Sequence, residues 1–389
     1  MRQPASTTPE IIVFLYLIQD LDVLLPILKA LKAINADAAA FVAPGLLLDS
    51  PRVRAALDRE DIPWYTSNAL EFKLRLTPKL RGVRALISAA DTTAYAHKPA
   101  HYLVNRANKM GIATYTLQHG LENIGLTYFD DEFPVDSVKF ASRSIFIWGG
   151  MDSLHPRVSA EVRNRCIPMG CPKEFSADTH PEFPIKAKGR KIVAVFENLH
   201  WRRYSDSYRF RFLEDLVAAS KARPDVLMIV KPHHAGRWLT DQYRGSLPQL
   251  PNLILVNPRD PQWEPFTAPS LINVADAVIT TPSTTVFDAA SVQKPVSVVG
   301  YDLDLSLYEP LPVLKSTGDW VDTLDGVSSS EELERASLAT RVFRSKFHHS
   351  SNPATKIALY IVSQLGNVVP VEVPEEIGPS TLNGSELRI

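Results

Sequence analysis

The sequence has little of several features that would mark a special class of protein. Its 389 residues include only two cysteines, Cys166 and Cys171, and carry a formal net charge of -1. Two cysteines make no disulfide framework and, without further ligands, no zinc site, so we expect two reduced thiols. The lack of a basic surplus gives no reason to expect a nucleic-acid-binding protein.

Long apolar runs are also missing. The run over residues 11–18 (IIVFLYLI) is far shorter than the roughly 20 residues of a membrane-spanning helix. The polar start, MRQPASTTPE, lacks the apolar centre of a signal peptide. We therefore expect a cytoplasmic protein, and peripheral contact with the inner face of a membrane stays open.

Several catalytic motifs are absent. The sequence contains no P-loop, no GxGxxG, no HExxH and no GxSxG. These absences argue against P-loop nucleoside triphosphatases, NAD enzymes of the dinucleotide-binding type, zincin proteases and α/β-hydrolases.

The chain does contain apolar strands that alternate with helices. The pattern predicts first-half strands at 11–18, 38–42, 62–65, 84–89, 113–117 and 144–148, with helices at 21–34, 52–59 and 99–110. Alternation of this kind is typical of βαβ units with a parallel sheet.

The alternation then stops and starts again. Residues 176–188 are polar and contain prolines, which indicates a linker. The pattern beyond it predicts strands at 191–196, 226–230, 253–256, 277–280 and 295–299, and helices at 209–220, 285–291, 331–347 and 354–365.

A chain of this length is too long for one core and indicates about two domains. We predict a first half (1–175) that binds an acceptor, the linker (176–188), a second half (189–347) that binds a nucleotide donor, a C-terminal helix (348–366) and a poorly ordered tail (367–389).

Ligands of open parallel sheets bind beyond the carboxyl ends of the strands. Gln118, His119 and Gly120 follow the predicted strand at 113–117. An imidazole there can act as a general base on an acceptor hydroxyl. A histidine bonded to the backbone of a turn is an equally good interpretation from position alone.

Two further segments follow strands of the second half. Lys231, Pro232, His233 and His234 offer donors suited to a phosphate, although a solvated basic turn explains them too. The run of hydroxyls Ser283, Thr284 and Thr285 lies where a helix begins, and it favours a phosphate site over simple capping.

Other polar residues near strand ends give weaker signals. Capping explains Asp20 and Asp91, and Asp302 and Asp304 are expected in a solvated loop. Residues expected to face the cleft are Glu197, Asn198, His200, Trp201, Arg202 and Arg203. His348 and His349 are expected at a helix end.

Three segments together resemble a known group of enzymes. QHG at 118–120, KPHH at 231–234 and ADAVITTPSTTVFDAA at 275–290 resemble motifs of the CDP-glycerol glycerophosphotransferases and of capsule-type transferases that use CMP-linked Kdo or sialic acid. Residues 165–175 also resemble the run that ends the first half of many such enzymes. The resemblance spans roughly residues 113–300 and implies the GT-B fold: α/β, with two Rossmann-like, doubly wound domains that face a cleft.

The resemblance also implies roles for particular residues. His119 and His233 match the catalytic histidines. The implied donor-binding residues are Lys231, Ser283, Thr284, Thr285 and Asp288, and the implied acceptor-binding residues are Gln118, Gly120, Glu122 and Asp91. The sequence departs from the motifs at two places: His234 replaces a proline, and Thr281-Pro282 replaces an Asp-Tyr pair.

We therefore expect a metal-independent glycosyltransferase without a cofactor. It would move a sugar from a nucleotide-sugar, with CMP-linked donors favoured, to a saccharide or lipid-linked acceptor in bacterial capsule polysaccharide or lipopolysaccharide synthesis. The alternatives are a CDP-glycerol-type glycerophosphotransferase, a nucleotide-sugar 2-epimerase, and a non-catalytic protein that binds nucleotide-sugars.

Overall fold

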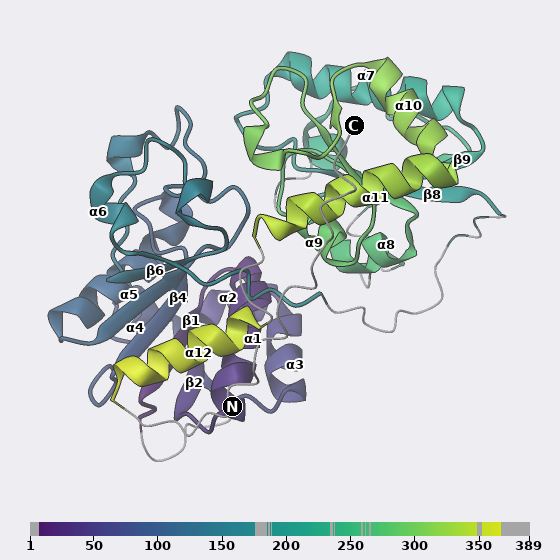
Figure 1. Ribbon diagram of the computed structural model, residues 1–389. Helices are drawn as coiled ribbons and strands as arrows, with labels where there is room; N and C mark the ends of the chain where they lie inside the picture. Colours follow the sequence, from purple (N-terminus) through teal and green to yellow (C-terminus); the bar gives the residue numbers. More distant parts are fainter. Residues whose placement is uncertain are drawn as a thin grey trace.

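The computed structural model describes residues 8–175, 185, 187, 189–233, 236, 238–257, 260, 262–263, 266–347 and 352–366. These residues form two lobes, each built on one sheet (Figure 1). The predicted tail at 367–389, His348 and His349 lie outside the described residues, as does the linker at 176–188 apart from residues 185 and 187.

The first half is built on seven parallel strands in the order β3-β2-β1-β4-β5-β6-β7. The strands are β1 (Ile11–Leu15), β2 (Ala38–Val42), β3 (Trp64–Tyr65), β4 (Ala85–Ala89), β5 (Ala113–Leu117), β6 (Ser144–Ile147) and β7 (Cys166–Pro168). Every residue of the central β1 is buried, as its continuous apolar run predicts for a strand covered on both faces.

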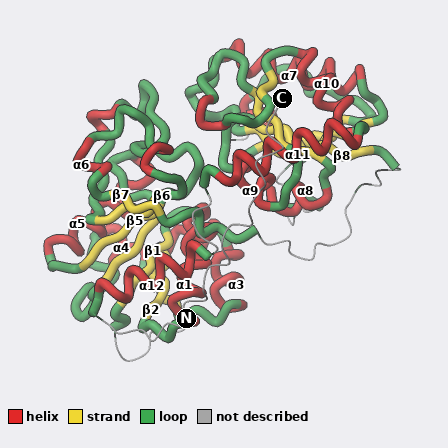
Figure 2. The backbone as a smooth tube through the Cα atoms, in the orientation of Figure 1, coloured by secondary structure: helices red, strands yellow, loops and turns green. Residues whose placement is uncertain are grey.

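Helices flank this sheet (Figure 2). They are α1 (Ile18–Ala33), α2 (Pro44–Asp49), α3 (Pro51–Arg59), α4 (Ala69–Lys73), α5 (Lys98–Lys109) and α6 (Ala160–Arg163). We predicted a strand to residue 18 and a helix from 21, but β1 ends at Leu15 and α1 begins at Ile18. The reason is Asp20, whose carboxylate accepts the backbone amides of Tyr16 and Leu17, both at 2.8 Å, and so fixes an earlier helix start.

The second half repeats the plan with six parallel strands in the order β10-β9-β8-β11-β12-β13. The strands are β8 (Lys191–Glu197), β9 (Val226–Pro232), β10 (Leu253–Leu255), β11 (Ala277–Thr280), β12 (Val296–Val299) and β13 (Val313–Leu314). Its helices are α7 (Asp206–Ala222), α8 (Ala268–Val274), α9 (Thr285–Ser291), α10 (Thr317–Val327) and α11 (Ser330–Ser345). Our prediction lacked α10, which the Ser316 hydroxyl caps by accepting the Asp319 amide.

The last helix, α12 (Pro353–Gln364), returns to the first half and packs against α1 (Figure 1). The ring of Tyr360 lies against Tyr115 and Phe146, with ring centroids 6.4 and 5.6 Å apart. The Arg84 guanidinium donates to the Leu365 carbonyl at the end of this helix. The chain therefore passes between the halves twice.

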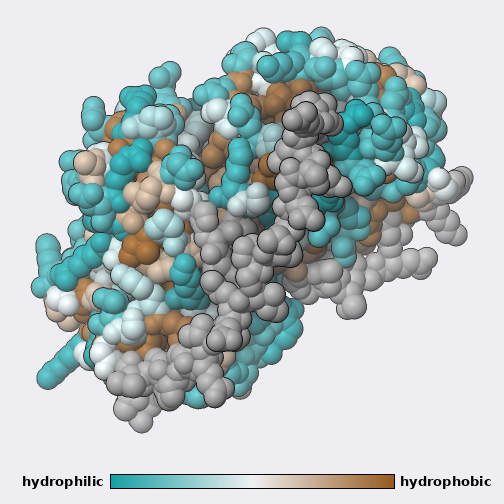
Figure 3. All heavy atoms as spheres, viewed as in Figure 1, coloured by the Kyte–Doolittle hydropathy of each residue, from teal (hydrophilic) through white to brown (hydrophobic). Residues whose placement is uncertain are grey.

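Apolar packing continues from one half into the other. Trp148, after β6, is 1% exposed and its ring centroid lies 5.3 Å from that of Phe287 in α9. The outside of the molecule is mainly hydrophilic in the view of Figure 3, with apolar residues scattered over both lobes. Among the described helices, none has both the length and the apolar character needed to cross a bilayer.

Candidate functional site

The loops after β5 and β11 meet between the two halves. The Leu121 amide donates to the Thr284 hydroxyl at 3.0 Å. A Cβ added to Gly120 would lie 3.0 Å from the same hydroxyl oxygen, so only glycine allows the loops to approach this closely without a shift. Two motifs that the sequence placed in separate halves are thus in direct contact.

His119 lies in this contact region, partly buried. Its ring packs edge-on against His97, with centroids 5.2 Å apart, and its backbone amide donates to Asn123 at 3.1 Å. Its Nδ1 is buried and has no hydrogen-bond partner among the described residues. Burial lowers the pKa of His119 to about 4, against a smaller opposing effect of the Asn123 side chain. The imidazole is therefore neutral near pH 7 and can accept a proton.

His97 shares this environment. Burial, together with the neighbouring His119, lowers the pKa of His97 to about 3. Its Nδ1 lies 2.7 Å from the Thr92 hydroxyl, which fixes the ring. No sequence pattern pointed to His97, because it lies in a short 3-10 turn (Tyr95–His97) and does not directly follow a strand.

Gln118 supports the loop. The residue is 1% exposed, and its side-chain oxygen accepts the Trp148 amide at 2.9 Å while its nitrogen donates to the Gly120 carbonyl at 2.9 Å. Both ends of the amide are thus used to hold the backbone around His119. Asp91 is similarly engaged, because its carboxylate accepts the Ser142 amide and hydroxyl, both at 2.7 Å.

A buried hydrogen-bond network supports the run of hydroxyl residues after β11. Asn198 accepts the hydroxyls of Thr281 and Tyr204, both at 2.6 Å, and donates to the Pro282 carbonyl at 2.9 Å. Thr281 and Pro282, the departure from the family motif, therefore shape this loop. Sequence reasoning placed Asn198 near the cleft without identifying this contact.

Ser283 caps the turn that leads into α9. Its hydroxyl accepts the Thr285 amide at 3.2 Å and lies 3.1 Å from the Thr280 hydroxyl. Thr284, by contrast, uses its hydroxyl on Leu121 of the other half. The three hydroxyl residues predicted to bind the nucleotide donor thus follow one another where the two halves touch.

Asp288 in α9 forms an ion pair with Lys173 at 2.6 Å. Both side chains are largely buried, and Asp22 approaches the same ammonium at 3.8 Å. Burial alone would lower the pKa of Lys173, but the charges of Asp288 and Asp22 raise it above its ordinary value. Asp288 therefore ties α9 to the end of the first half, and nothing in the sequence pattern singled out Lys173 as its partner.

A second ion pair joins the halves. Glu122 and Arg203 lie 2.5 Å apart, with side chains only 11% and 9% exposed. The Arg203 guanidinium also lies 4.8 Å from the centre of the Tyr128 ring. Glu122, an implied acceptor residue, thus connects the loop after β5 with the loop after β8.

The basic segment at β9 is arranged differently from our prediction. We expected the strand to end at residue 230, but β9 continues to Pro232, so Lys231 lies within it. The His233 amide donates to the Glu197 carbonyl at 2.8 Å, and its ring stacks on His200 with centroids 4.9 Å apart. His234 lies outside the described residues.

Glu197 ends β8 beside this histidine pair. It is 3% exposed, and its carboxylate accepts the Leu199 amide at 2.7 Å. Burial raises the pKa of Glu197 to about 7. Burial likewise raises the pKa of Asp20, in the first turn of α1, to about 7.

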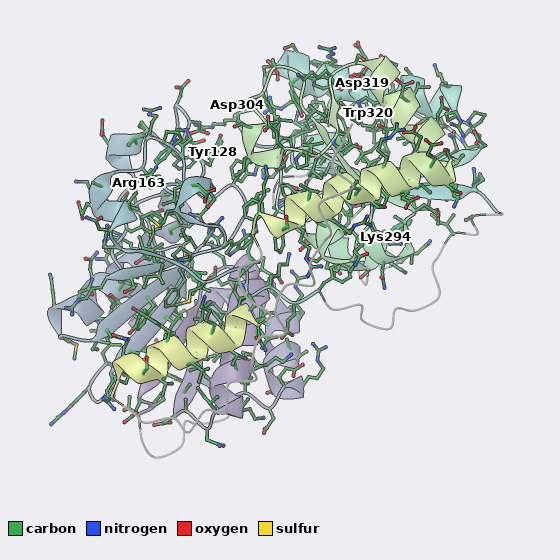
Figure 4. The ribbon with its side chains drawn as sticks, viewed as in Figure 1. Tyr128, Arg163, Lys294, Asp304, Asp319 and Trp320 are labelled. Atoms are coloured by element: carbon green, nitrogen blue, oxygen red, sulfur yellow. The ribbon has the colours of Figure 1, made fainter. Side chains whose placement is uncertain are left out.

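A cavity of about 720 Å³ opens between the halves next to the Glu122–Arg203 pair. Tyr128 of the first half and Asp304 of the second half face each other across its opening (Figure 4). We expected Asp304 in a solvated loop, and its carboxylate accepts the Ser306 amide at 3.0 Å in that loop. The cavity is large enough for a small-molecule ligand.

Within the described part of the chain, no group of three or more histidine, cysteine, aspartate or glutamate side chains is placed to hold a metal ion. Cys166 and Cys171 are both free thiols, as expected.

Comparison with known proteins gives matches in structure alone. No protein-family model and no curated sequence matches the chain. A UDP-GlcNAc 2-epimerase from Neisseria meningitidis, bound to UDP-GlcNAc, superposes with a TM-score of 0.61 at 14% identity, over 91% of this chain and 99% of its own. A glycosyltransferase from Rickettsia africae has a TM-score of 0.56 at 14% identity, over 92% and 99%.

The wall teichoic acid polymerase TagF superposes with a TM-score of 0.57 at 13% identity, over 92% of this chain and 88% of TagF. Identities this low show a shared architecture rather than a shared reaction. Two parallel, helix-flanked sheets that match these structures over nearly the whole chain show that this protein has the GT-B fold.

Proposed function

We propose that this protein is a transferase that uses a nucleotide-activated donor. The observation that carries the proposal is the contact between the loop of His119, after β5, and the hydroxyl run at Ser283–Thr285, after β11. A neutral base and a set of hydroxyl and amide donors thereby meet between the halves, where ligands of parallel sheets bind. Solved structures of the same fold include a 2-epimerase bound to UDP-GlcNAc, which supports a nucleotide-sugar as the ligand.

In the proposed reaction the donor phosphates lie near Ser283 and Thr285, with Lys231 and His233 beside them. The acceptor hydroxyl lies against the first half, and the His119 imidazole takes its proton as the oxygen attacks the transferred group. The bond between that group and the nucleotide phosphate breaks, and the nucleotide leaves with the bonding electrons. Lys231, His233 and the backbone amides stabilise the leaving phosphate, so the proposed reaction requires no metal ion.

A cytidine nucleotide is the favoured donor, because the three motifs resemble enzymes that use CMP- or CDP-linked substrates. TagF, among the structural neighbours, has also been solved after a soak with CDPG. The proposed reaction is sugar transfer from a CMP-sugar in bacterial surface polysaccharide synthesis. Transfer of glycerophosphate from a CDP-linked donor is the close alternative.

A nucleotide-sugar 2-epimerase is the second candidate. Two solved epimerases are among the neighbours with the higher TM-scores, 0.61 and 0.59. The buried carboxyl groups of Asp20, in the first turn of α1, and of Glu197, the last residue of β8, could also move protons during epimerisation. This candidate requires inversion at C2 of UDP-GlcNAc without any acceptor, with or without hydrolytic release of UDP. NMR of the sugar protons and an assay for free UDP measure the two outcomes.

The test of the transferase is calorimetric titration with CMP, CDP, UDP and GDP in the presence of EDTA. We expect a cytidine nucleotide to bind, and Ser283→Ala to weaken its binding about tenfold through loss of one hydrogen bond to a charged group. Ser291→Ala is the matched control, because the Ser291 hydroxyl lies at the far end of α9 and, among the described residues, bonds only to the Phe287 carbonyl. Preference for UDP would favour the epimerase, and failure to bind any nucleotide would overturn both proposals.

A further inference from the structure

The segment between β3 and β4 exposes apolar and basic side chains together. Leu70, Leu74 and Leu76 are 65%, 59% and 61% exposed. The exposed cations of the same segment are Lys73, Arg75, Lys79 and Arg81. We call the three leucines and these four cations the basic leucine patch. Large apolar side chains rarely gather on the surface in this way unless the surface contacts a partner or a membrane.

Local structure fixes these leucines on the outside. Helix α4 begins where the Asn68 side chain accepts the Glu71 amide at 2.8 Å. It ends at Lys73, and the φ of 59° at Arg75 turns the chain back so that the Leu76 amide reaches the Glu71 carbonyl at 2.9 Å. Phe72 points the other way and packs on Phe14, with ring centroids 6.2 Å apart. The exposure of the leucines is thus built into a well-anchored turn.

Neighbouring elements support and extend the patch. The Arg106 guanidinium of α5 donates to the Arg75 carbonyl at 2.5 Å, and the Arg75 guanidinium lies 3.7 Å from the centre of the Tyr102 ring. Helix α2 contacts α4 and adds Leu48, which is 81% exposed. The apolar surface therefore reaches across two helices.

The charge of the patch selects the kind of partner. Glu71 is the one acidic residue from 68 to 82, and no described carboxylate forms an ion pair with any of the four cations. A second copy of the chain that presented the same patch would place cation against cation. A partner that is negatively charged at its surface and apolar beneath that surface fits the patch better. A membrane of anionic lipids has this composition, with charged headgroups above apolar acyl chains.

The patch also lies near the carboxyl ends of strands in the first sheet. Phe72 packs on Phe14 and Phe41, each the fourth residue of its five-residue strand, so α4 lies at the carboxyl ends of β1 and β2. His119 follows the carboxyl end of β5 in the same parallel sheet. We propose that the basic leucine patch, beside the carboxyl ends of β1 and β2, binds the protein to an anionic membrane surface. The leucines enter the headgroup layer and the four cations contact lipid phosphates.

This inference does not depend on the proposed reaction and is tested without substrate. Purified protein is sedimented with vesicles of phosphatidylglycerol in phosphatidylcholine, and with vesicles of phosphatidylcholine alone. We expect binding to the anionic vesicles only, and weaker binding at high salt. A variant with Lys73→Gln, Lys79→Gln and Arg81→Gln should bind at least tenfold more weakly, since each cation near such a surface contributes about fivefold.

A second variant, Leu70→Ser with Leu74→Ser and Leu76→Ser, tests the apolar contribution and should also lose at least tenfold in binding. Leu338→Ser with Val342→Ser is the matched control, because those side chains are 53% and 46% exposed on α11 of the second half. All variants should keep the wild-type melting temperature, since the changed side chains are exposed. Equal binding by the leucine variant and wild type would overturn the proposal, as would a wild-type dimer in light scattering that the leucine variant converts to monomer.

Discussion

His119 shows how burial sets the chemistry of a single side chain. Its ring is enclosed by His97 and by the loop that Gln118 holds, and its pKa is lowered to about 4. A base with this pKa is unprotonated throughout the neutral range, although it is weaker than a free histidine.

We predict that His119→Asn lowers kcat by about 10²–10⁴-fold, the usual contribution of a general base. Binding of the nucleotide in calorimetry should change little. For the wild type, kcat/KM should show no acidic limb near the ordinary histidine pKa of about 6.5. His101→Asn is the control, because within the described part of the chain the His101 ring forms a hydrogen bond to the Asp91 carbonyl alone. An acidic limb near that value, lost in His119→Asn, would contradict a buried neutral base.

Glu197 leads to a prediction about stability and pH. Burial raises its pKa from 4.5 to about 7, so the folded state holds a proton that the unfolded state has released between these values. Stability is therefore lost as the pH rises through this window, by about 3 kcal/mol for a shift of this size. Glu197→Gln, which stays neutral, should become more stable than the wild type above about pH 7.

The measurement is urea unfolding of both proteins across this range of pH. Buried His97 and His119 act in the opposite direction, because their lowered pKa values cost stability as the pH falls below 6.5. The difference between variant and wild type is therefore the informative quantity. Glu214→Gln, at an exposed position on α7, should show no such trend, and a Glu197→Gln curve parallel to the wild type would refute the argument.

At the scale of elements, much of the fold could be predicted because parallel strands buried on both faces leave continuous apolar runs. β2, β5, β11 and α9 lie where the sequence placed them. α10 was missed although its buried residues Trp320, Leu324 and Val327 recur at helical spacing, because these few apolar residues lie among acidic residues and glycines. The strand-end rule also located the loops at 118–120 and 283–285.

The contacts between these loops could not be predicted in the same way. Lys173 pairs with Asp288, and Arg203 with Glu122, only because two separately folded sheets come together. No periodicity or spacing encodes such a pair. The same holds for Asn198, which acts through Thr281 and Pro282 of another strand end.

The approach of the two loops gives a prediction at this scale. In Gly120→Ala the new methyl group would meet the Thr284 hydroxyl at 3.0 Å and push the loops apart. We expect a several-fold rise in the KM of the donor, with a loss of stability of about 1 kcal/mol or less. Adding Thr284→Ala should remove the clash and restore part of the affinity. If the loss of donor affinity in the double variant equals the product of the losses in the two single variants, the two residues act independently.

At the scale of the whole molecule, the Glu122–Arg203 pair holds the halves together through a nearly dry contact. Removing one partner leaves a buried charge, which costs about 3–5 kcal/mol, whereas replacing both with apolar side chains costs much less. We predict that Arg203→Met is clearly less stable than Glu122→Leu with Arg203→Met. Urea unfolding of the single and double variants checks the order, and a double variant at least as unstable as the single would show that the pair contributes real net attraction.

The return of α12 to the first half has a consequence for how such a protein can be recombined. Because α12, the last described helix, packs on the first half, the second half is an insert with two seams, one beyond β7 and one before Pro353. A chimera that takes a new donor-binding half from another protein must therefore be cut and rejoined at both seams. A single crossover would leave α1, Tyr115 and Phe146 facing a foreign helix where Tyr360 belongs.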